Sequence, residues 1–381
     1  MRILVFGAGR MGSAVAYDLL RSPGVAGVLV VDGRREALRA LQRWLRDARL
    51  RVEQLEAEDR GSVVAALRAC DAAVNALPYR YNEALARAAI AAGTHLCDLG
   101  GSHEMVARQQ RLDPAARRRG VTILPDCGLA PGLTSVLVAH GVRLLRRVER
   151  IAIYTGGLPQ RPRPPLNYQL FFSPEGLINE YAEPVRVLRG GRLIKVEPLT
   201  ELEEIHFRGF GKLEAFNTSG GSSTLVESYR RRVRDLTEKT IRYPGHCGQL
   251  QALRALGFFS SKPIKLDGQE VVPRRVLEIL LEGTLGSEVP DVVFVRVALW
   301  GQTQRGRRSV VYELDARYDR LRKMTAMMRT TAFPASIAAQ WLAQGKLPAG
   351  VQRPEVALPA DAFLQQLAWR GLRVQQRWQR G

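Results

Sequence analysis

Three glycines near the start of the chain are spaced so that they could bind the phosphates of a dinucleotide. Gly7, Gly9 and Gly12 form the pattern G-x-G-x-x-G directly after an apolar run at residues 3–6. In this pattern the glycines allow a tight turn, a close approach of the backbone to a pyrophosphate, and close packing of the following helix. The amino end of that helix offers free N–H groups and a partial positive charge. We therefore predict a dinucleotide cofactor at this turn.

An acidic residue stands where the ribose of that cofactor would lie. Asp32 ends a second apolar run, residues 28–31, and follows Gly12 by twenty residues. Its carboxylate would accept hydrogen bonds from the ribose hydroxyls and would repel a 2′-phosphate, which favours NAD. Two arginines follow Gly33 at once and could hold that phosphate instead, so NADP stays open as the alternative.

Strand and helix patterns alternate over the first third of the chain. Strand-like apolar runs occur at residues 3–6, 28–31, 52–55, 71–77, 94–97 and 121–124. Helical patterns lie between them, at residues 34–49, 59–69, 81–92 and 104–119. The alternation predicts a doubly wound parallel sheet of the Rossmann type over residues 1–132, in an α/β protein.

Ligands of such sheets bind outside the carboxyl ends of the strands. Four loops should lie at that edge, namely residues 7–12, 75–79, 98–102 and 126–132, and three of them carry polar or titratable groups within a glycine-rich backbone. Together with the residues after Asp32, these loops supply our further cofactor-binding candidates, which are Arg10, Met11, Gly33, Arg34, Asn75, Leu77, Pro78, Gly100 and Gly128.

The pattern changes beyond residue 133, where strands and helices are mixed. Strand patterns occur at residues 150–155, 213–216, 292–300 and 310–318, and a hairpin with a Gly-Gly turn at 185–196. They predict an α+β substrate and oligomerisation domain with a mainly antiparallel sheet at residues 133–323. A helical stretch at 324–344, which we expect to break at Pro334, and a last helix at 360–377 form a C-terminal segment, 324–381. We expect that segment to pack on the Rossmann domain.

Composition narrows the function classes. The net charge is +20, but fifty of the 57 basic residues are arginines scattered along the chain without interleaved stacking aromatics. Charge alone supports only non-specific association, so we expect no specific nucleic-acid partner. No apolar run reaches the roughly 20 residues of a membrane span, and no secretory signal precedes the first strand, which predicts a cytoplasmic protein. The four cysteines lack C-x-x-C spacing and should be free thiols, with no metal site.

Several segments resemble a known family. Residues 76–79 (ALPY), 98–101 (DLGG) and 126–133 (DCGLAPGL), behind the GAGRMG turn, resemble the saccharopine dehydrogenase-like superfamily. Within it, the lysine 6-dehydrogenase family is similar at residues 172–181 (FSPEGLINEY), 214–224 (EAFNTSGGSST), 239–246 (KTIRYPGH) and 327–331 (MMRTT). The resemblance implies NAD(P)-dependent oxidative deamination of the ε-amino group of L-lysine to allysine, which cyclises to piperideine-6-carboxylate. It also implies a homodimer or larger homo-oligomer.

That reaction needs a base for the substrate ammonium and a group that orients the distant carboxylate. For the base we predict Asp126, which could instead cap the following helix, with Tyr79 and His246 as the other candidates. For the carboxylate we predict Arg242 and Lys239, because a guanidinium offers a bidentate match. Tyr243 and His246 could complete the same carboxylate-binding surface.

The remaining substrate candidates lie in two other segments of the second domain. Asn217, Thr218 and Ser219 precede a Gly-Gly pair and could contact substrate through side chains or backbone N–H groups. Glu175 and Asn179 could bind the α-ammonium group. A solvated helix face explains these last two equally well.

Two other functions stay open. A reductase that joins an amine to a carbonyl compound, of the saccharopine or carboxynorspermidine type, shares much of the pattern. It would need a second carboxylate or amine anchor. A non-catalytic NAD-sensing or nucleic-acid-associated protein is the alternative from another class, and the polar loops at the sheet edge argue against it.

Overall fold

The computed structural model describes residues 1–286 and 289–380, which form two compact units. The first unit comprises Met1–His140 and Met328–Arg373, and the second comprises Gly141–Met327 and the chain from Val374 onward. The divisions at 140 and 327 lie a few residues beyond the domain boundaries expected at 132 and 323. Two helices, α7 (Leu133–Leu144) and α12 (Ala326–Ala343), run across these divisions of the chain.

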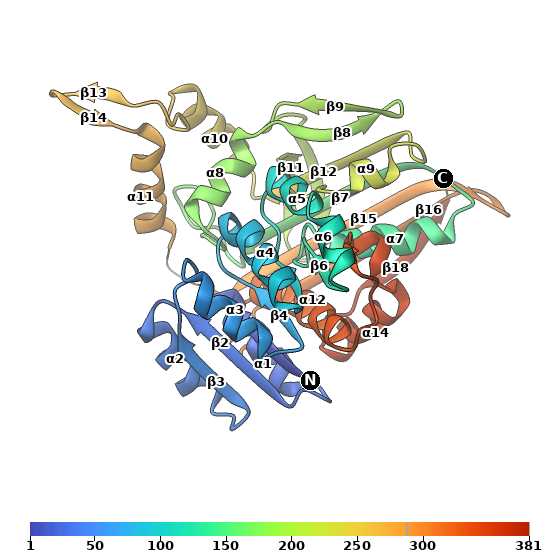
Figure 1. Ribbon diagram of the computed structural model, residues 1–381. Helices are drawn as coiled ribbons and strands as arrows, with labels where there is room; N and C mark the ends of the chain where they lie inside the picture. The colour runs from blue at the N-terminus through green and yellow to red at the C-terminus, as the bar shows by residue number, and fades with distance from the viewer. Residues whose placement is uncertain (287–288, 381) are drawn as a thin grey trace. The chain divides into compact units, whose positions relative to one another are not determined.

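The first unit contains a parallel sheet, drawn mostly in blue in Figure 1, with the order β17-β6-β5-β4-β1-β2-β3. This confirms the doubly wound fold. The strands are β1 (Arg2–Phe6), β2 (Gly27–Asp32), β3 (Leu50–Gln54), β4 (Ala72–Asn75), β5 (His95–Asp98), β6 (Thr122–Leu124) and β17 (Gly350–Val351). The helices are α1 (Arg10–Arg21), α2 (Arg35–Leu45), α3 (Arg60–Arg68), the 3-10 turn η1 (Tyr79–Tyr81), α4 (Asn82–Ala92), α5 (His103–Gln110), α6 (Asp113–Arg118), α13 (Pro354–Ala357) and α14 (Ala360–Trp369).

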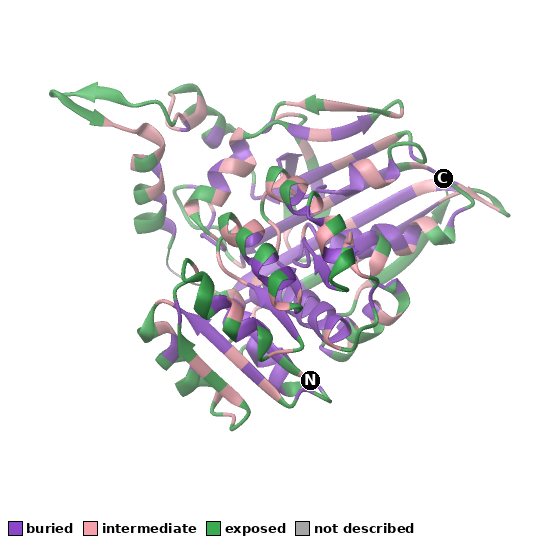
Figure 2. Cartoon of the chain, viewed as in Figure 1, coloured by how far each residue is buried: buried purple, intermediate pink, exposed green. Residues whose placement is uncertain are grey.

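The central strand β1 sets the edge at which the loops emerge. Phe6, its last residue, pairs in register with Val31 at the end of β2 and with Asn75 at the end of β4. Residues 3–6 are completely buried, because helices cover both faces of a parallel sheet. Figure 2 shows the same burial along the inner strands of this sheet. The glycine turn, Asp32 and the loop after Asn75 therefore leave the sheet at one edge.

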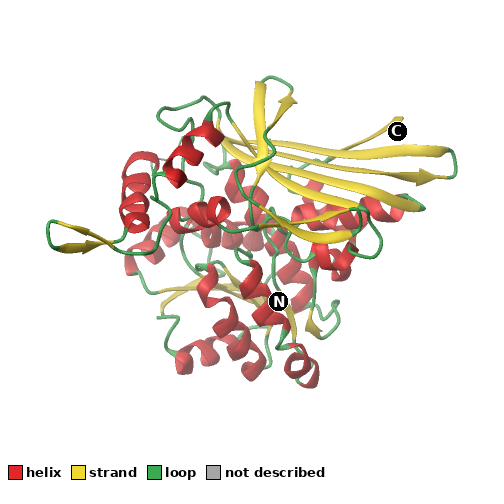
Figure 3. Ribbon diagram, turned by 90° about the horizontal axis from the view of Figure 1, so that it is seen from above, coloured by secondary structure: helices red, strands yellow, loops and turns green. Residues whose placement is uncertain are grey.

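The second unit is built on a mixed sheet that is mainly antiparallel, as predicted. Its order is β10-β11-β12-β7-β15-β16-β18, and β8 and β9 form a hairpin that joins it at β12. The longest strands run side by side in one twisted layer, seen in yellow in Figure 3. The strands are β7 (Arg147–Pro159), β8 (Val185–Arg189), β9 (Arg192–Val196), β10 (Glu203–Phe207), β11 (Gly211–Asn217), β12 (Asp235–Arg242), β15 (Asp291–Thr303), β16 (Gly306–Arg317) and β18 (Gln375–Arg380).

Helices and a separate hairpin complete the second unit. Four helices occur among its described residues, α8 (Pro174–Ala182), α9 (Leu225–Tyr229), α10 (His246–Ala255) and α11 (Pro273–Leu285). Strands β13 (Ile264–Leu266) and β14 (Gln269–Val271) pair only with each other. One apolar core unites α8, α10 and α11 through residues such as Leu177, Leu250 and Leu281. In the part of the chain that the structure describes, no helix is long and apolar enough to cross a membrane.

Two expectations for the C-terminal segment were wrong. Helix α12 does not break at Pro334 but continues through it, and the residues on either side of that proline are buried, which holds the helix together by packing. The last helix ends at Trp369 rather than near 377, because Gly371 adopts a left-handed φ of 83°. Residues Gln375–Arg380 instead form β18, which adds to the sheet of the second unit beside β16.

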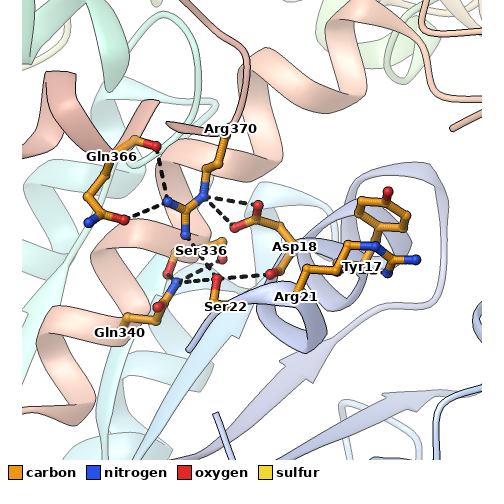
Figure 4. Close-up of polar contacts among 8 residues, drawn as sticks. All are labelled: Tyr17, Asp18, Arg21, Ser22, Ser336, Gln340, Gln366 and Arg370. Atoms are coloured by element: carbon orange, nitrogen blue, oxygen red, sulfur yellow. Dashed lines mark hydrogen bonds and ion pairs between the residues drawn. The ribbon is translucent and has the colours of Figure 1, made fainter. Parts of the chain in front are cut away.

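A buried ion pair ties the C-terminal helices to α1 within the first unit (Figure 4). Arg370, which follows α14, donates from Nε to both carboxylate oxygens of Asp18 at 2.9 and 2.8 Å. It also donates from Nη2 to Ser22 at 3.0 Å and from Nη1 to Gln366. Gln340 of α12 donates to Ser22 as well, at 3.1 Å. Three helices are therefore joined by one buried polar network.

Candidate functional site

The glycine turn has the close geometry that a dinucleotide requires. Gly7 has a φ of 102°, which a side chain rarely adopts, and its N–H donates to Val31 O at 2.7 Å. A Cβ on Gly12 would lie 1.9 Å from Gly7 O, so only glycine lets α1 approach β1 this closely. Gly9 occupies the N-cap position of α1 and offers no side-chain cap. The first N–H groups of α1 are thus available to phosphate oxygens.

Asp32 is buried and held in its ionised form beside this turn. It accepts from Ala8 N at 2.8 Å and from Arg34 N at 2.8 Å, and the Arg34 side chain approaches it at 3.3 Å. Burial raises the pKa of Asp32, but these hydrogen bonds outweigh that effect and keep the pKa below its usual value.

A recess of about 80 Å³ opens next to Asp32. Apolar side chains, including Phe6 and Leu55, line it together with three carboxylates, those of Asp32, Glu56 and Glu58. An apolar recess rimmed by hydrogen-bond acceptors suits an adenine base and its ribose hydroxyls. The residues present therefore fit the adenosine half of a dinucleotide.

The loop after β4 is folded by its own asparagine. Asn75 accepts from Leu77 N at 3.0 Å and donates to Asn82 at 2.7 Å, and it is 1% exposed. Its role is thus to shape the loop that carries Leu77, Pro78 and Tyr79. A Cβ on Gly7 would lie 3.1 Å from Ala76 O, so this loop and the glycine turn adjoin.

Asp98 and Asp126 lie together at the ends of β5 and β6. Asp98 accepts from Gly100 N at 2.8 Å, from Asp126 N at 3.1 Å and from Gln109 Nε2 at 2.7 Å. Asp98 therefore braces both loops, and burial raises its pKa although the hydrogen bonds oppose that rise. A Cβ on Gly100 would lie 2.6 Å from Asp126 Oδ1, which places the Asp126 carboxyl group against Gly100.

The thiol next to Asp126 is not a reactive one. Cys127 is 1% exposed, and burial with the nearby Cys97 thiol raises its pKa well above the usual value. All four cysteines are free. Over residues 1–286 and 289–380, no group of three or more His, Cys, Asp or Glu side chains could hold a metal ion.

In the second unit, the residues predicted to bind the substrate carboxylate point to two different faces of β12. Side chains alternate along a strand, so Glu238, Thr240 and Arg242 share one face. Lys239 lies on the other, where its Nζ contacts Glu203 at 2.7 Å. Tyr243 points away as well, since its hydroxyl donates to Pro159 O at 2.9 Å. Lys239 and Tyr243 are therefore not brought together with Arg242.

Arg242 is the centre of a buried polar group. Its side chain is 3% exposed, and Nε donates to the Tyr181 hydroxyl at 3.0 Å while Nη1 donates to Ile241 O at 2.9 Å. The guanidinium carbon lies 4.6 Å from the centre of the Tyr168 ring. Nη2 faces Glu180 Oε2 at 3.7 Å. These contacts hold a permanent positive charge inside the second unit.

His246 supports this group as a neutral residue. Its Nδ1 lies 2.9 Å from Leu166 O, which can only accept, so Nδ1 carries the proton. Nε2 then accepts from the Tyr181 hydroxyl at 3.0 Å. Burial and the charge of Arg242 lower the pKa of His246 to about 3. A neutral, buried imidazole with both nitrogens occupied is a positioning residue, so the role of general base expected for His246 does not fit its surroundings.

The loop of residues 217–221 is tied to α8. Ser219 donates from its N–H to Glu180 O at 2.9 Å and from its hydroxyl to Asn179 O at 3.1 Å. The hydroxyls of Thr218 and Thr240 lie 2.6 Å apart, and Asn217 donates to Thr200.

The two α8 residues expected to bind the α-ammonium group have other surroundings. The Asn179 side chain accepts from Arg274 of α11. Glu175 is exposed one turn earlier. Neither of them lies in the group around Arg242.

Sequence reasoning missed four members of the Arg242 group, which are Tyr168, Glu180, Tyr181 and Glu238. Two of them end the segment 172–181 that carried the resemblance, and Glu238 stands four residues before Arg242 on the same strand face. The alternation of β12 was the available signal for Glu238. No pattern in the sequence pairs α8 with β12.

Comparisons with known proteins identify the family. A family model described as the saccharopine dehydrogenase NADP binding domain matches residues 3–124, and one described as the saccharopine dehydrogenase C-terminal domain matches residues 128–372. The chain belongs to the saccharopine dehydrogenase family. Its first unit is therefore an NAD(P)-binding domain of this family of oxidoreductases. The finer resemblance to lysine 6-dehydrogenases stays a prediction, as do the homo-oligomer and the cytoplasmic location.

Individual relatives are distant. The chain is 25% identical over 272 residues to bovine mitochondrial alpha-aminoadipic semialdehyde synthase, a match that covers 68% of this chain but 28% of that protein. It is 23% identical over 307 residues to carboxynorspermidine synthase of Vibrio cholerae, covering 74% and 72% of the two chains. Among solved structures, the apo saccharopine dehydrogenase (L-Glu forming) of Saccharomyces cerevisiae matches with a TM-score of 0.81 at 17% identity over 99% of both chains. This last match establishes the shared fold.

Proposed function

We propose that the protein catalyses NAD(P)-dependent oxidative deamination of the ε-amino group of L-lysine, yielding allysine and ammonia. The observation that carries this proposal is the guanidinium of Arg242, the one buried arginine among the described residues of the second unit, surrounded by acidic and aromatic side chains. Among the described residues of the second unit, the other buried basic side chain, Lys239, is engaged with Glu203. One carboxylate anchor suits a substrate with one carboxylate.

The reaction divides into steps that assign roles to residues. A bound nicotinamide would accept the hydride that leaves the ε-carbon. Asp126 takes the proton that the ε-ammonium group must lose before the C–N bond is oxidised, and Tyr79 is the second candidate for this role. Water then adds to the resulting iminium carbon, and ammonia leaves. Arg242 holds the α-carboxylate so that the chain of the substrate is oriented.

The cofactor recess supports NAD as the preferred dinucleotide. Three carboxylates line it, and a 2′-phosphate would bring negative charge among them. Arg34, which follows Asp32 by two residues, has a side chain that is 69% exposed and is already bound to Asp32. We therefore expect tighter binding of NAD than of NADP.

The names of the relatives favour a second candidate. One relative is named as the synthase of carboxynorspermidine, and another as a dehydrogenase that forms L-Glu from saccharopine. A condensing reductase of this kind would need a further anchor for the second molecule. In this alternative Arg242 would hold one of several carboxylates.

One assay separates the two candidates. Purified protein with L-lysine and NAD at alkaline pH is expected to raise the absorbance at about 340 nm and to release ammonia, because lysine alone supplies the hydride. NADP in place of NAD should give a weaker signal. Consumption of NADPH only when an amine and a keto acid or aldehyde are both present would instead identify a condensing reductase.

Replacing Asp126 tests the proposed base. Asp126→Asn should lower kcat at least about tenfold while NAD(P) binding, followed by fluorescence titration, stays nearly intact. Asp126 has a φ of 65°, a conformation that asparagine tolerates, so the loop should keep its shape. Asp47→Asn, on the surface of the same unit, is the matched control. An unchanged kcat in Asp126→Asn would remove Asp126 from this role.

A further inference from the structure

In the second unit, one oxygen of the Glu238 carboxyl group is buried without a hydrogen bond to any described residue. Glu238 is 3% exposed, and its Oε2 has no hydrogen bond among the described residues. A Cβ on Gly221 would lie 2.5 Å from the Glu238 carboxyl carbon, so a glycine leaves room for this group. A buried carboxyl oxygen without a hydrogen bond raises the free energy of the folded protein. A ligand that donates to Glu238 would remove that cost.

The charges around Glu238 do not balance. Arg242 faces Glu180 at 3.7 Å, and the same guanidinium also attracts Glu238. The group therefore holds one permanent positive charge and two carboxyl groups. Burial raises the pKa of Glu180 to about 7, although Arg242 opposes the rise. Burial and the neighbouring Glu180 carboxyl group raise the pKa of Glu238 well above its usual value, and Arg242 again opposes the rise. A second positive charge would allow both acids to ionise.

We propose that Glu180 and Glu238 bind the α-ammonium group of an α-amino acid whose carboxylate is held by Arg242. The proposal rests on the proposed function and adds the recognition of the amino-acid head. An α-amino acid carries its ammonium and carboxylate groups on one carbon, so the side chains that bind them must be neighbours. We call Glu180, Glu238 and Arg242 together the receptor. Glu180 and Arg242 are such neighbours, and the ammonium group supplies the second positive charge.

The surrounding elements place this receptor at an accessible position. The Glu180 side chain is 30% exposed, whereas Arg242 and Glu238 lie deeper. The hydrogen bond from Ser219 N to Glu180 O joins α8 to the loop that contains Gly221. Glu180 thus forms the outer part of the receptor and Glu238 the inner part.

The pH dependence of binding follows from the groups that face Glu180. Arg242 and Glu238 of β12 and Tyr181 of α8 interact with Glu180. Next to them, Tyr168 contacts Arg242 and His246 of α10 contacts Tyr181, while Arg274 and Glu278 of α11 pair beside Asn179. His246 is neutral, and the pKa values of Tyr181 and Arg242 are raised, so Glu180, with its pKa of about 7, is the group that titrates near neutral pH. Ionised carboxylates attract an ammonium ion, and affinity should rise as the pH rises through about 7.

Calorimetric titration of the full chain with L-lysine and with 6-aminohexanoate tests the receptor. The second compound keeps the carboxylate and the ε-ammonium group but lacks the α-ammonium group. Wild type should bind L-lysine about 30-fold more tightly, in line with a charge-assisted contact, and Glu180→Gln should reduce that ratio below about threefold. Glu238→Gln, which keeps the size of the buried side chain, should also reduce it. Glu282→Gln on the exposed face of α11 is the control and should leave the ratio unchanged.

The outcomes separate this proposal from the proposed function. Lysine affinity in wild type should rise about tenfold between roughly pH 6 and 8, and this rise should be absent in Glu180→Gln. If folded Glu180→Gln and Glu238→Gln both keep the wild-type ratio, the receptor is wrong even when lysine reduces NAD. If the ratio collapses in these variants but wild type never oxidises lysine, the receptor stands and the proposed deamination is wrong.

Discussion

Arg370→Ala should lower the free energy of unfolding of the first unit by about 3–5 kcal/mol, because it leaves the Asp18 carboxylate buried without its partner. Both side chains are at most 5% exposed, and Arg370 uses all three of its nitrogens in hydrogen bonds. Water cannot replace these contacts without opening the packing of α1 against α12 and α14. The measurement is the shift in the midpoint of chemical denaturation.

Two further variants make this result specific. Arg87→Ala removes an exposed partner of Glu83 on α4 and should change stability by less than about 0.5 kcal/mol. Asp18→Asn added to Arg370→Ala should recover part of the loss, because a neutral amide costs less to bury than an unpaired charge. A loss in Arg370→Ala as small as that in Arg87→Ala would contradict the structural role of the pair.

The stability of Arg370→Ala should depend on pH. Burial raises the pKa of Asp18, and Arg370 opposes that rise, so the pKa should climb further when Arg370 is absent. At a pH between the pKa of Asp18 in the unfolded chain and its higher pKa in the folded variant, folding takes up a proton. The stability of the variant therefore falls as the pH rises through that range. The loss caused by Arg370→Ala should therefore be smaller in acid than at neutral pH.

Gly12→Ala should reduce the affinity for NAD(P) at least about 100-fold, because the pyrophosphate depends on a close approach of α1 to the glycine turn. The new Cβ would lie 1.9 Å from Gly7 O, and backbone atoms must move to relieve that contact. We also expect the substitution to lower the stability of α1. Alanine ordinarily has the opposite effect and stabilises a helix by about 1 kcal/mol relative to glycine. Titration of NADH fluorescence measures the affinity, and circular dichroism measures the fold.

Gly61→Ala is the matched control for this prediction. Gly61 lies in α3 of the same unit, and a Cβ there would be 3.5 Å from Asp59 Oδ1, an ordinary contact. We expect it to leave NAD(P) affinity unchanged and stability equal or slightly higher. Wild-type affinity in Gly12→Ala would show that the turn does not bind the pyrophosphate.

The sequence alone was sufficient for the features that depend on local spacing. The glycine turn, the strand before it and Asp32 follow one another within 32 residues, and their contacts are decided by that spacing. The parallel sheet, the antiparallel second sheet and the β8–β9 hairpin were predicted from strand-length apolar runs and turn residues. Such patterns persist because each strand or helix must bury its apolar face wherever it packs.

The tertiary structure decided which polar side chains meet. Arg370 and Asp18 are 352 positions apart in the chain, and Arg242 and Tyr181 are 61 apart, so no local pattern pairs them. The pleat of β12 directs Lys239 away from Arg242 although both stand in one motif. Burial then changes the chemistry, making His246 neutral and leaving Glu238 Oε2 without a hydrogen bond among the described residues. Desolvation and pairing depend on what packs around a side chain, and for this protein only the folded chain determines that.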